Sequence, residues 1–540
     1  MPEKMSETYN DTISRIRSQC REHADLAMRI IGWIFHSRRP LCAIELQHAF
    51  AVETNDEQLD ITALHQIDLM ISVCGGLVSL ETEVGTVRFV HYTVQEYLAG
   101  MSEQLFPGAV VDIARTCLTY LSFRDFENGP CETERLCDQR LVEHPFLDYA
   151  ACNWGNHTRG ILESELMEWI LHFLHDLPKC STALQIFFRS LDGHSCIRER
   201  NYCLPLRYPA LHIAAGLGLR NVCCRVLEQT DVNDLDCRDQ TALFWAAEHG
   251  HDHVVQLLLE YNVNHAYIST YSNKPALSMA IMKRQEATVR LMLNAGCMTG
   301  HYDFEYAVEF GLEGIVRALL EHELWGDETE NSSSFVTAAC RGYANVLELL
   351  LEKFDIPLDI DYVNGLTALI TAAHEGHTEC VRLLLDYDAD VRTELFDRDM
   401  VLSVHFTEIS TTALHESARS GKLEMMQWVA DCVESVDITN SEGQTPLHIA
   451  VANNDAAMVQ LLLDRNANPV HLDNHRQTPI NIAVASEYTE ILRILRHSVD
   501  CRSPSSVLSS KRPAMDQSPL TEEDSTSRTG FQQRKKHLSA

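Results

Sequence analysis

One pattern recurs nine times in the middle of the chain, and it restricts the fold more than any other feature of the sequence. Its copies begin at Pro209, Thr241, Pro275, Tyr302, Ser333, Thr367, Thr412, Thr445 and Thr478. Successive starts are separated by 32, 34, 27, 31, 34, 45, 33 and 33 residues. A period of about 20 to 50 residues is typical of repeat architectures, in which each unit covers the apolar face of its neighbour. The sequence therefore predicts a stack of similar units.

The copy at 445–468, TPLHIAVANNDAAMVQLLLDRNAN, shows what one unit can form. Thr445 can cap a first helix, and the small alanines that follow allow close packing. After a turn, the apolar run from Met458 to Leu463 predicts a second helix that one unit cannot bury alone. Asn466 and Asn468 favour a turn into an extended finger. Each unit is predicted to be helix, turn, helix and finger.

The copies resemble the ankyrin repeat, most closely at Thr445-Pro446-Leu447-His448 and at Gly376-His377. The resemblance implies a mainly α fold, with an ankyrin-repeat solenoid of about nine repeats over residues 205–498. The long step before Thr412 implies inserted residues around 393–410, and the short step before Tyr302 implies a shortened finger.

The fourth position of the T-P-L-H pattern holds a histidine in three copies, at His212, His415 and His448. The resemblance implies that these histidines make structural hydrogen bonds between repeats. They are therefore not taken as catalytic bases.

Before the repeats, the apolar spacing predicts helices over 10–36, 44–50 and 64–73, followed by strands at 77–81 and 87–91. Helices followed by a small hairpin are the outline of a winged helix. This outline favours a DNA-binding module only where the recognition helix is basic, and residues 51–100 hold one basic residue, Arg88, among eight acidic ones. The sequence therefore predicts a structural winged helix.

Three segments of this part of the sequence are distinctive: RIIGWIFHSRRPLCAIELQHAF at 29–50, VRFVHYTVQEYLAG at 87–100 and HPFLDYAACNWGNHTRG at 144–160. These segments resemble the winged helix and the helical connector of fungal NACHT–ankyrin proteins, which are nucleotide-switched signalling proteins of the STAND, or NLR-like, class. Met1 to Ile13 resembles the end of their nucleotide-binding domain.

The resemblance divides the chain into four parts: 1–104, the end of the nucleotide-domain region with the winged-helix-like segment; 105–204, the helical connector; 205–498, the ankyrin-repeat array; and 499–540, a tail predicted to be disordered. The sequence contains no G-x-x-x-x-G-K-[ST] loop, so the NACHT domain itself is lacking. No nucleotide or other cofactor is expected to bind.

Charge narrows the classes of partner. The chain has 44 basic and 77 acidic residues, a net charge of −33, and this field repels phosphate backbones and anionic membranes. We therefore expect no nucleic acid and no membrane as partner. The 18 cysteines are too sparse for a disulfide scaffold, and neither a signal peptide nor a membrane span is evident, which predicts an intracellular, cytoplasmic protein. Basic clusters at Lys511-Arg512 and 534–536 make the nucleus the alternative compartment.

Catalysis and metal binding find little support. His249, His251 and His253, like His374 and His377, have short spacings, but each set lies at the predicted turn between two repeat helices, where rings do not converge on one point. No G-x-S-x-G motif is present. The sequence predicts no catalytic, metal-binding or cofactor-binding residues and no enzyme.

Exposed positions of the first helices and of the fingers remain, and in ankyrin arrays they line a concave groove that binds proteins. The candidate protein-binding residues are Cys237, Arg238, Gln240, Glu248, His249, Val363, Asn364, Leu366, His374, Glu375, Arg419, Ser420, Ser441, Glu442, Gln444, Asn453, Asn474, His475 and Gln477.

The leading hypothesis is a non-enzymatic scaffold or adaptor in fungal signalling or innate-immunity-like recognition, which binds a basic or mixed-charge protein. The first alternative is the sensing half of a nucleotide-switched NACHT receptor, truncated by a gene-model error. The second is a nuclear regulatory ankyrin protein. The sequence does not fix the oligomeric state.

Overall fold

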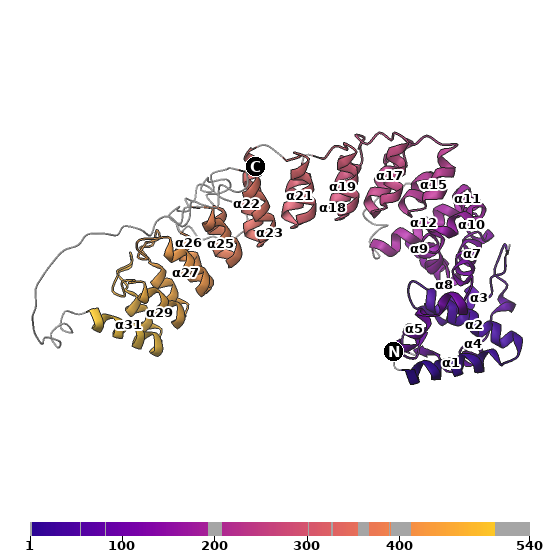
Figure 1. Cartoon of the computed structure of the whole chain (residues 1–540), viewed down its shortest axis with the longest axis horizontal. Helices are drawn as coiled ribbons and strands as arrows, with labels where there is room; N and C mark the ends of the chain where they lie inside the picture. Colours follow the sequence, from indigo (N-terminus) through magenta and orange to yellow (C-terminus); the bar gives the residue numbers. More distant parts are fainter. Residues whose placement is uncertain are drawn as a thin grey trace, which may run out of the picture. The chain divides into compact units, whose positions relative to one another are not determined.

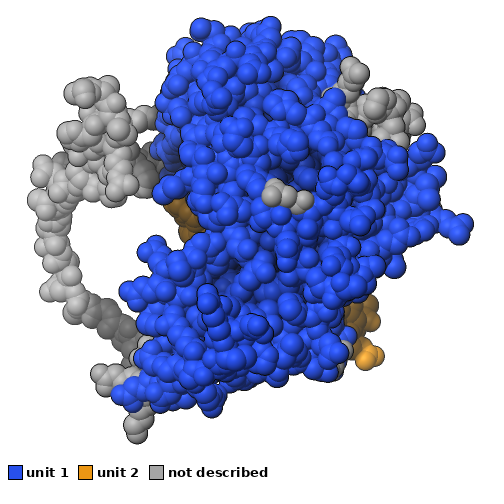
Figure 2. Space-filling view, turned by 90° about the vertical axis from the view of Figure 1, so that its right-hand side faces the viewer, with its two compact units in different colours: residues 1–357 blue, residues 358–540 orange. Residues whose placement is uncertain are grey.

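The structure is a computed structural model that describes residues 3–54, 56–81, 83–192, 208–300, 302–325, 328–354, 367–387, 389 and 412–502. The chain forms two compact units, residues 1–357 and 358–540, which are coloured separately in Figure 2. Both are built mainly from helices, as predicted (Figure 1). The predicted insertion at 393–410 and the tail from 503 onward lie outside the described residues.

A small mixed segment opens unit 1. Its elements are α1 (Glu3–Arg17), α2 (Arg21–His36), β1 (Leu41–Cys42), α3 (Ala43–Phe50), η1 (Ile61–Ala63), α4 (Ile67–Ser72), β2 (Val78–Glu81), β3 (Thr86–Phe89) and α5 (Tyr92–Ala99). The three strands form an antiparallel sheet in the order β1-β3-β2, with Leu41 opposite Val87 and Val78 opposite Phe89. The predicted hairpin is thus confirmed as β2 and β3, and β1 adds a third strand beside β3.

The helix predicted over 10–36 is wrong as a single element, because the structure breaks it between α1 and α2. Cys20 has extended backbone angles, with φ −58° and ψ 151°, and stands at the N-cap of α2. The Gln19 side chain donates a hydrogen bond to the carbonyl of Val73 at 2.8 Å. The break lets α1 pack against α5 as well as α2, through contacts such as that of Tyr9 with Thr93.

Eight short helices then connect this segment to the repeats: α6 (Ser102–Leu105), α7 (Ala109–Leu121), η2 (Arg124–Phe126), α8 (Glu134–Glu143), α9 (Leu147–Thr158), α10 (Ile161–Glu165), α11 (Met167–His175) and α12 (Leu177–Asp192). We call residues 102–192 the connector. Within the described part of the chain, no helix is both long and apolar enough to span a membrane.

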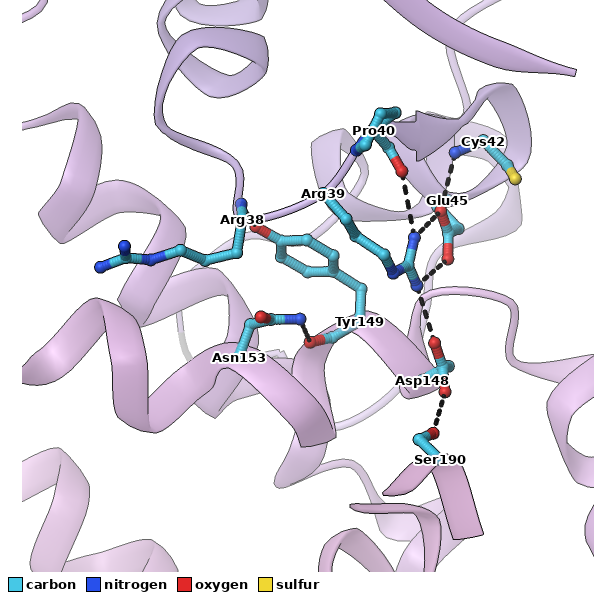
Figure 3. Close-up of polar contacts among 9 residues, drawn as sticks. All are labelled: Arg38, Arg39, Pro40, Cys42, Glu45, Asp148, Tyr149, Asn153 and Ser190. Atoms are coloured by element: carbon cyan, nitrogen blue, oxygen red, sulfur yellow. Dashed lines mark hydrogen bonds and ion pairs between the residues drawn. The ribbon is translucent and has the colours of Figure 1, made fainter. Parts of the chain in front are cut away.

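A charged network fastens the first segment to the connector (Figure 3). The Arg39 guanidinium donates to both oxygens of Glu45, at 2.9 and 2.7 Å, and to Asp148 at the start of α9, at 2.7 Å. Ser190 of α12 donates to the other oxygen of Asp148 at 2.8 Å. The same guanidinium lies 5.2 Å from the ring centroid of Tyr149. One arginine therefore holds α3 against α9.

Each predicted repeat appears as a pair of helices. The first helices are α14 (Ala210–Gly216), α16 (Ala242–His249), α18 (Ala276–Met282), α20 (Asp303–Glu309) and α22 (Glu328–Arg341) in unit 1, and α24 (Ala368–Glu375), α26 (Ala413–Ser420), α28 (Pro446–Ala452) and α30 (Pro479–Ala485) in unit 2.

The second helices are α15 (Arg220–Leu227), α17 (Asp252–Glu260), α19 (Glu286–Asn294), α21 (Glu313–Glu321) and α23 (Ala344–Lys353) in unit 1, and α25 (Thr378–Asp386), α27 (Leu423–Asp431), α29 (Ala456–Asp464) and α31 (Thr489–Arg502) in unit 2. Within each unit, first helices pack beside first helices and second helices beside second helices (Figure 1).

Two local predictions about the repeats are confirmed. Thr445 stands at the N-cap of α28, with a capping box to His448. Residues 295–302 connect α19 to α20, whereas the longer 261–275 connects α17 to α18 and contains the paired strands β4 (Ile268–Ser269) and β5 (Lys274–Pro275). The finger before α20 is therefore shortened, as the 27-residue step indicated.

The connector covers the end of the first repeat. Glu163 is 3% exposed, and its carboxylate accepts hydrogen bonds from the backbone N–H groups of Asn221 at 2.6 Å and Val222 at 3.4 Å. These are among the N–H groups that helix α15 leaves without an intrahelical partner. The Arg159 side chain donates to the carbonyl of Leu217 at 2.6 Å. The connector thus supplies the cap that a preceding repeat would otherwise provide.

We expect Glu163→Ala to destabilise unit 1 by about 1–2 kcal/mol, because it removes a charged acceptor from a helix N-terminus and leaves buried N–H groups unpaired. The urea midpoint of the full chain, followed by helical circular dichroism, measures the loss.

Glu165→Ala is the matched control, since this half-exposed carboxylate pairs with Arg115 on the surface. Equal midpoints for the two variants would contradict the capping role of Glu163.

Candidate protein-binding face

The fingers are small closed loops with a shared hydrogen-bond pattern. In three of them, the first residue donates its backbone N–H to the carbonyl of the fifth at 2.9 Å: Asp236 to Gln240, Asn440 to Gln444 and Asp473 to Gln477. The side-chain oxygen of the first residue accepts the N–H of the fifth at 2.7 to 2.9 Å. The loop is thereby fixed before any partner binds.

Adjacent fingers are also bonded to each other. The Asn474 backbone N–H donates to the Glu442 carbonyl at 2.9 Å, and its side-chain amide donates to the Ser441 carbonyl at 2.8 Å. In unit 1, the Thr270 hydroxyl donates to the Asp239 carboxylate at 2.7 Å. Finger tips that the sequence nominated for partner binding therefore also set the spacing of the repeats.

The structure confirms the expected role of the three histidines at the fourth position. Nε2 of His212, His415 and His448 lies 2.9, 3.0 and 3.3 Å from the carbonyl oxygens of Gln240, Gln444 and Gln477. In His448, Nδ1 accepts the N–H of Thr445 at 3.0 Å, so the ring proton is on Nε2 and points to the next finger. Burial lowers the pKa of all three rings, which keeps them neutral.

We call the exposed side of the first helices, together with the finger tips, the first-helix face. Among the candidate residues, eight are exposed: Cys237, Glu375, Arg419, Ser441, Asn453, Asn474, His475 and Gln477. Seven are half-buried: Arg238, Glu248, His249, His374, Ser420, Glu442 and Gln444. Gln240 is only 7% exposed, and its carbonyl holds His212, so its part is structural. Val363, Asn364 and Leu366 lie outside the described residues.

In the first two repeats, the connector contacts this face. The Arg238 guanidinium stacks 5.1 Å from the ring centroid of Phe188 in α12, and Trp245 meets the same ring at 5.9 Å. His249 lines a small apolar pocket together with Trp245 and Phe187. Arg238 and His249 are thus engaged within the chain, which the sequence alone did not indicate.

In unit 2, the structure brings together two candidates and one residue that sequence analysis missed. The Glu416 side chain is 3% exposed; its Oε2 lies 2.8 Å from His374 Nδ1 and 3.2 Å from Arg419 Nε. Its position on the first helix matches that of Ile449 in the TPLHI copy, which is normally apolar. An acidic residue at an apolar repeat position is the signal that would have identified it.

The histidine runs make structural bonds. His251 Nε2 lies 2.9 Å from the carbonyl of Gly216, and His253 Nε2 lies 3.0 Å from that of Gly218, both in the preceding repeat. His249 Nδ1 lies 3.0 Å from the carbonyl of Trp245. In the described ranges, no three His, Cys, Asp or Glu side chains are grouped as ligands for a metal ion.

Sequence analysis also missed a cluster on α18 and α20. Tyr306 and Phe310 are in ring contact at 4.4 Å, and the Tyr306 hydroxyl donates to the carbonyl of Met282 at 3.5 Å. Arg284 lies with its guanidinium carbon 5.7 Å from the Phe310 ring centroid. These residues occur in two weaker copies, and only an alignment of those copies with the clear ones would have placed them on the face.

Comparison with known proteins gives two family matches. A model described as ankyrin repeats (3 copies) matches residues 211–303, 304–394 and 414–504, together just over half of the chain. A model described as the winged helix domain of GPI inositol-deacylase matches residues 15–105. Neither describes a nucleotide-binding domain.

Curated relatives resemble the repeat region. "Probable E3 ubiquitin-protein ligase XBOS33" of Oryza sativa subsp. japonica is 30% identical over 192 residues, 34% of this chain and 32% of its own length. "Ankyrin repeat and KH domain-containing protein mask-1" of Caenorhabditis elegans is 27% identical over 54% of this chain and 11% of its own. "Ankyrin repeat protein nuc-2" of Neurospora crassa is 26% identical over 43% and 21%. The chain spans about a third or less of each.

Two histidines that flank Glu416 should affect stability in opposite directions as pH changes. Burial lowers the pKa of His415 from 6.5 to about 4. Between these two pH values the ring is protonated in the unfolded chain and neutral in the folded chain. Stability is therefore lost as pH falls from 6.5 towards 4, by about 3 kcal/mol at most. In His415→Gln we expect this loss to disappear; hydrogen exchange of peptides from α26, compared with wild type at each pH, measures it.

The hydrogen bond with Glu416 raises the pKa of His374 above 6.5. The contribution of this pair to stability is complete below the pKa of His374 in the unfolded chain, and it is lost as pH rises through the pKa in the folded chain. We expect His374→Gln to weaken protection of α24 and α26 at pH 6 more than at pH 9. A larger effect at pH 9 would show that the pair is not an ion pair.

Proposed function

The chain belongs to the ankyrin-repeat family, and from that premise we propose that it is a non-enzymatic scaffold that binds a protein of basic or mixed charge through its first-helix face. The observation that carries this proposal is that different groups in the repeats hold the structure together and face the solvent. Buried histidines and backbone bonds of the fingers hold the repeats in register, whereas the side chains of Glu375, His475 and Gln477 are exposed on the same face. Exposed side chains on rigid supports are suited to recognition.

The acidic balance supports the choice of partner. Residues 205–498 carry 20 basic and 43 acidic residues, so the array attracts basic surfaces and repels nucleic acid. In the winged-helix segment, α4 (IDLMIS) carries an aspartate and no basic residue, which favours a structural role over DNA reading. Three relatives carry names that differ in activity, and the shared repeats are what this chain has in common with them.

A pair of charge-matched variants tests the proposal. The face variant combines Glu375→Arg, Gln477→Arg and His475→Ala; the control combines Asp464→Arg, Gln460→Arg and Gln427→Ala on exposed positions of second helices. Both change the net charge equally. We expect the face variant to lose at least about tenfold of the proteins that wild type retains from an extract of its own cells, because only this variant alters the recognition surface.

Quantitative mass spectrometry of the retained proteins provides the measurement, and circular dichroism confirms that both variants fold. If both variants retain the proteins as wild type does, or both lose them equally, the first-helix face of unit 2 is not the binding surface.

The resemblance of residues 29–50 and 87–100 to NACHT–ankyrin proteins motivates one other role, as the sensing half of a nucleotide-switched receptor. Under that hypothesis the transcript continues upstream into a Gly-x-x-x-x-Gly-Lys loop, and the native protein exceeds 61.1 kDa. An intact mass of 61.1 kDa from its own cells would remove this role and leave the cytoplasmic scaffold.

A further inference from the structure

A part of the first-helix face in unit 1 differs from the rest of the array. In repeats one and two the connector contacts the face through Phe188 and its neighbours. The next first helices, α18 and α20, present Met282, Tyr306 and Phe310. Phe310 is 38% exposed, although its ring packs against Tyr306 at 4.4 Å. An exposed phenylalanine that packs on a half-buried tyrosine offers a partner apolar area with a preset shape, and the half-buried Met282 lies at the end of the neighbouring first helix.

Three cationic residues in this part of the array differ in whether a carboxylate already pairs with them. Lys283 pairs with Glu248 at 3.2 Å, and Arg341 pairs with Glu309 at 3.3 Å. Arg284 is exposed and stacks on Phe310 at 5.7 Å, and among the described carboxylates none lies within ion-pair distance of it. Its N–H donors remain open to a ligand, in a protein that otherwise has an excess of carboxylates.

The backbone of Arg284 adds a second observation. Arg284 has φ +61°, in the left-handed region, at the turn where other repeats place a glycine such as Gly250 or Gly376, and where two repeats place Asn454 and Glu487. This conformation is unfavourable for a long side chain and normal for glycine. The repeat therefore retains an arginine at a position where glycine would fold more easily.

We propose that α18 and α20 form a docking site for a protein segment that places an aspartate or glutamate next to an aromatic or aliphatic side chain. The carboxylate bonds to the Arg284 guanidinium, and the apolar side chain packs on Phe310 and Met282. Charge complementarity selects this occupant, since the Arg284 guanidinium lies on the Phe310 ring without a described carboxylate partner, whereas Lys283 and Arg341 are paired with Glu248 and Glu309. The proposal rests on the proposed scaffold function and specifies the partner chemistry at one place on its face.

The test uses the full chain and a displayed library of random twelve-residue peptides. Peptides selected on wild type are synthesised with a fluorescent label, and their affinities are measured by anisotropy. We expect the selected peptides to combine Asp or Glu with an aromatic or aliphatic residue. We expect Arg284→Asn to weaken their binding at least tenfold, and Arg284→Lys to restore part of it, because lysine keeps the charge without the planar stacking.

Arg284→Asn is chosen because Asn454 occupies the equivalent turn with φ +57°, so the fold accepts this residue there. Its thermal midpoint should equal or exceed that of wild type, which separates loss of binding from loss of folding. Glu487→Asn is the matched control, since Glu487 has φ +59° at the equivalent turn of the last repeat. Peptide affinity should be unchanged in this control.

The outcomes separate the two proposals. Selected peptides rich in lysine and arginine, or affinities that Arg284→Asn changes less than twofold, overturn the docking site. If such peptides instead lose binding in the Glu375→Arg, Gln477→Arg, His475→Ala variant, the scaffold function stands without this site. If wild type enriches no peptide beyond the Arg284→Asn chain, the docking site is likewise rejected.

Discussion

Each repeat in this chain depends on its neighbour, because its second helix exposes more apolar surface than the repeat can bury by itself. Leu462 and Leu463 of α29, for example, are buried, and α29 packs against α27, α28 and α31. In an array of this kind, the first repeat needs another element to pack against its outer face. The connector provides it, with a glutamate on the open N-terminus of α15 and Gly155 set so close to Leu217 that a Cβ there would lie 2.9 Å from its side chain.

The parts of the fold that follow from local chemistry were predictable from the sequence. Thr445 before a proline, the short connection before α20 and the fourth-position histidines have the same role in any ankyrin-like unit, so period and composition identify them. The break at Ser18 to Cys20 was not predictable, since the contact that accompanies it, from the Gln19 side chain to the carbonyl of Val73, joins residues distant in the sequence. Helical periodicity continues across that break and conceals it.

The candidate site divides in the same way. Exposed finger and helix positions such as Asn453 and His475 follow from the repeat register. The engagement of Arg238 by Phe188 does not, because α12 belongs to a different part of the chain. Glu416 and Arg284 are exceptions to the repeat pattern, one acidic where the pattern is apolar and one in a glycine turn. Departures from a repeat carry more information about function than the repeat itself.

The contact of Gly155 with Leu217 also bears on how such a chain can change over evolutionary time. Recombination between similar copies adds or removes whole units of about 33 residues, and histidine and finger bonds of the same kind form again at every new junction. The first two repeats are matched to the connector, the first through Leu217, Asn221 and Val222 and the second through Trp245. Gene-length variation should therefore concentrate beyond residue 275, while the first two repeats and the connector are inherited as a single block.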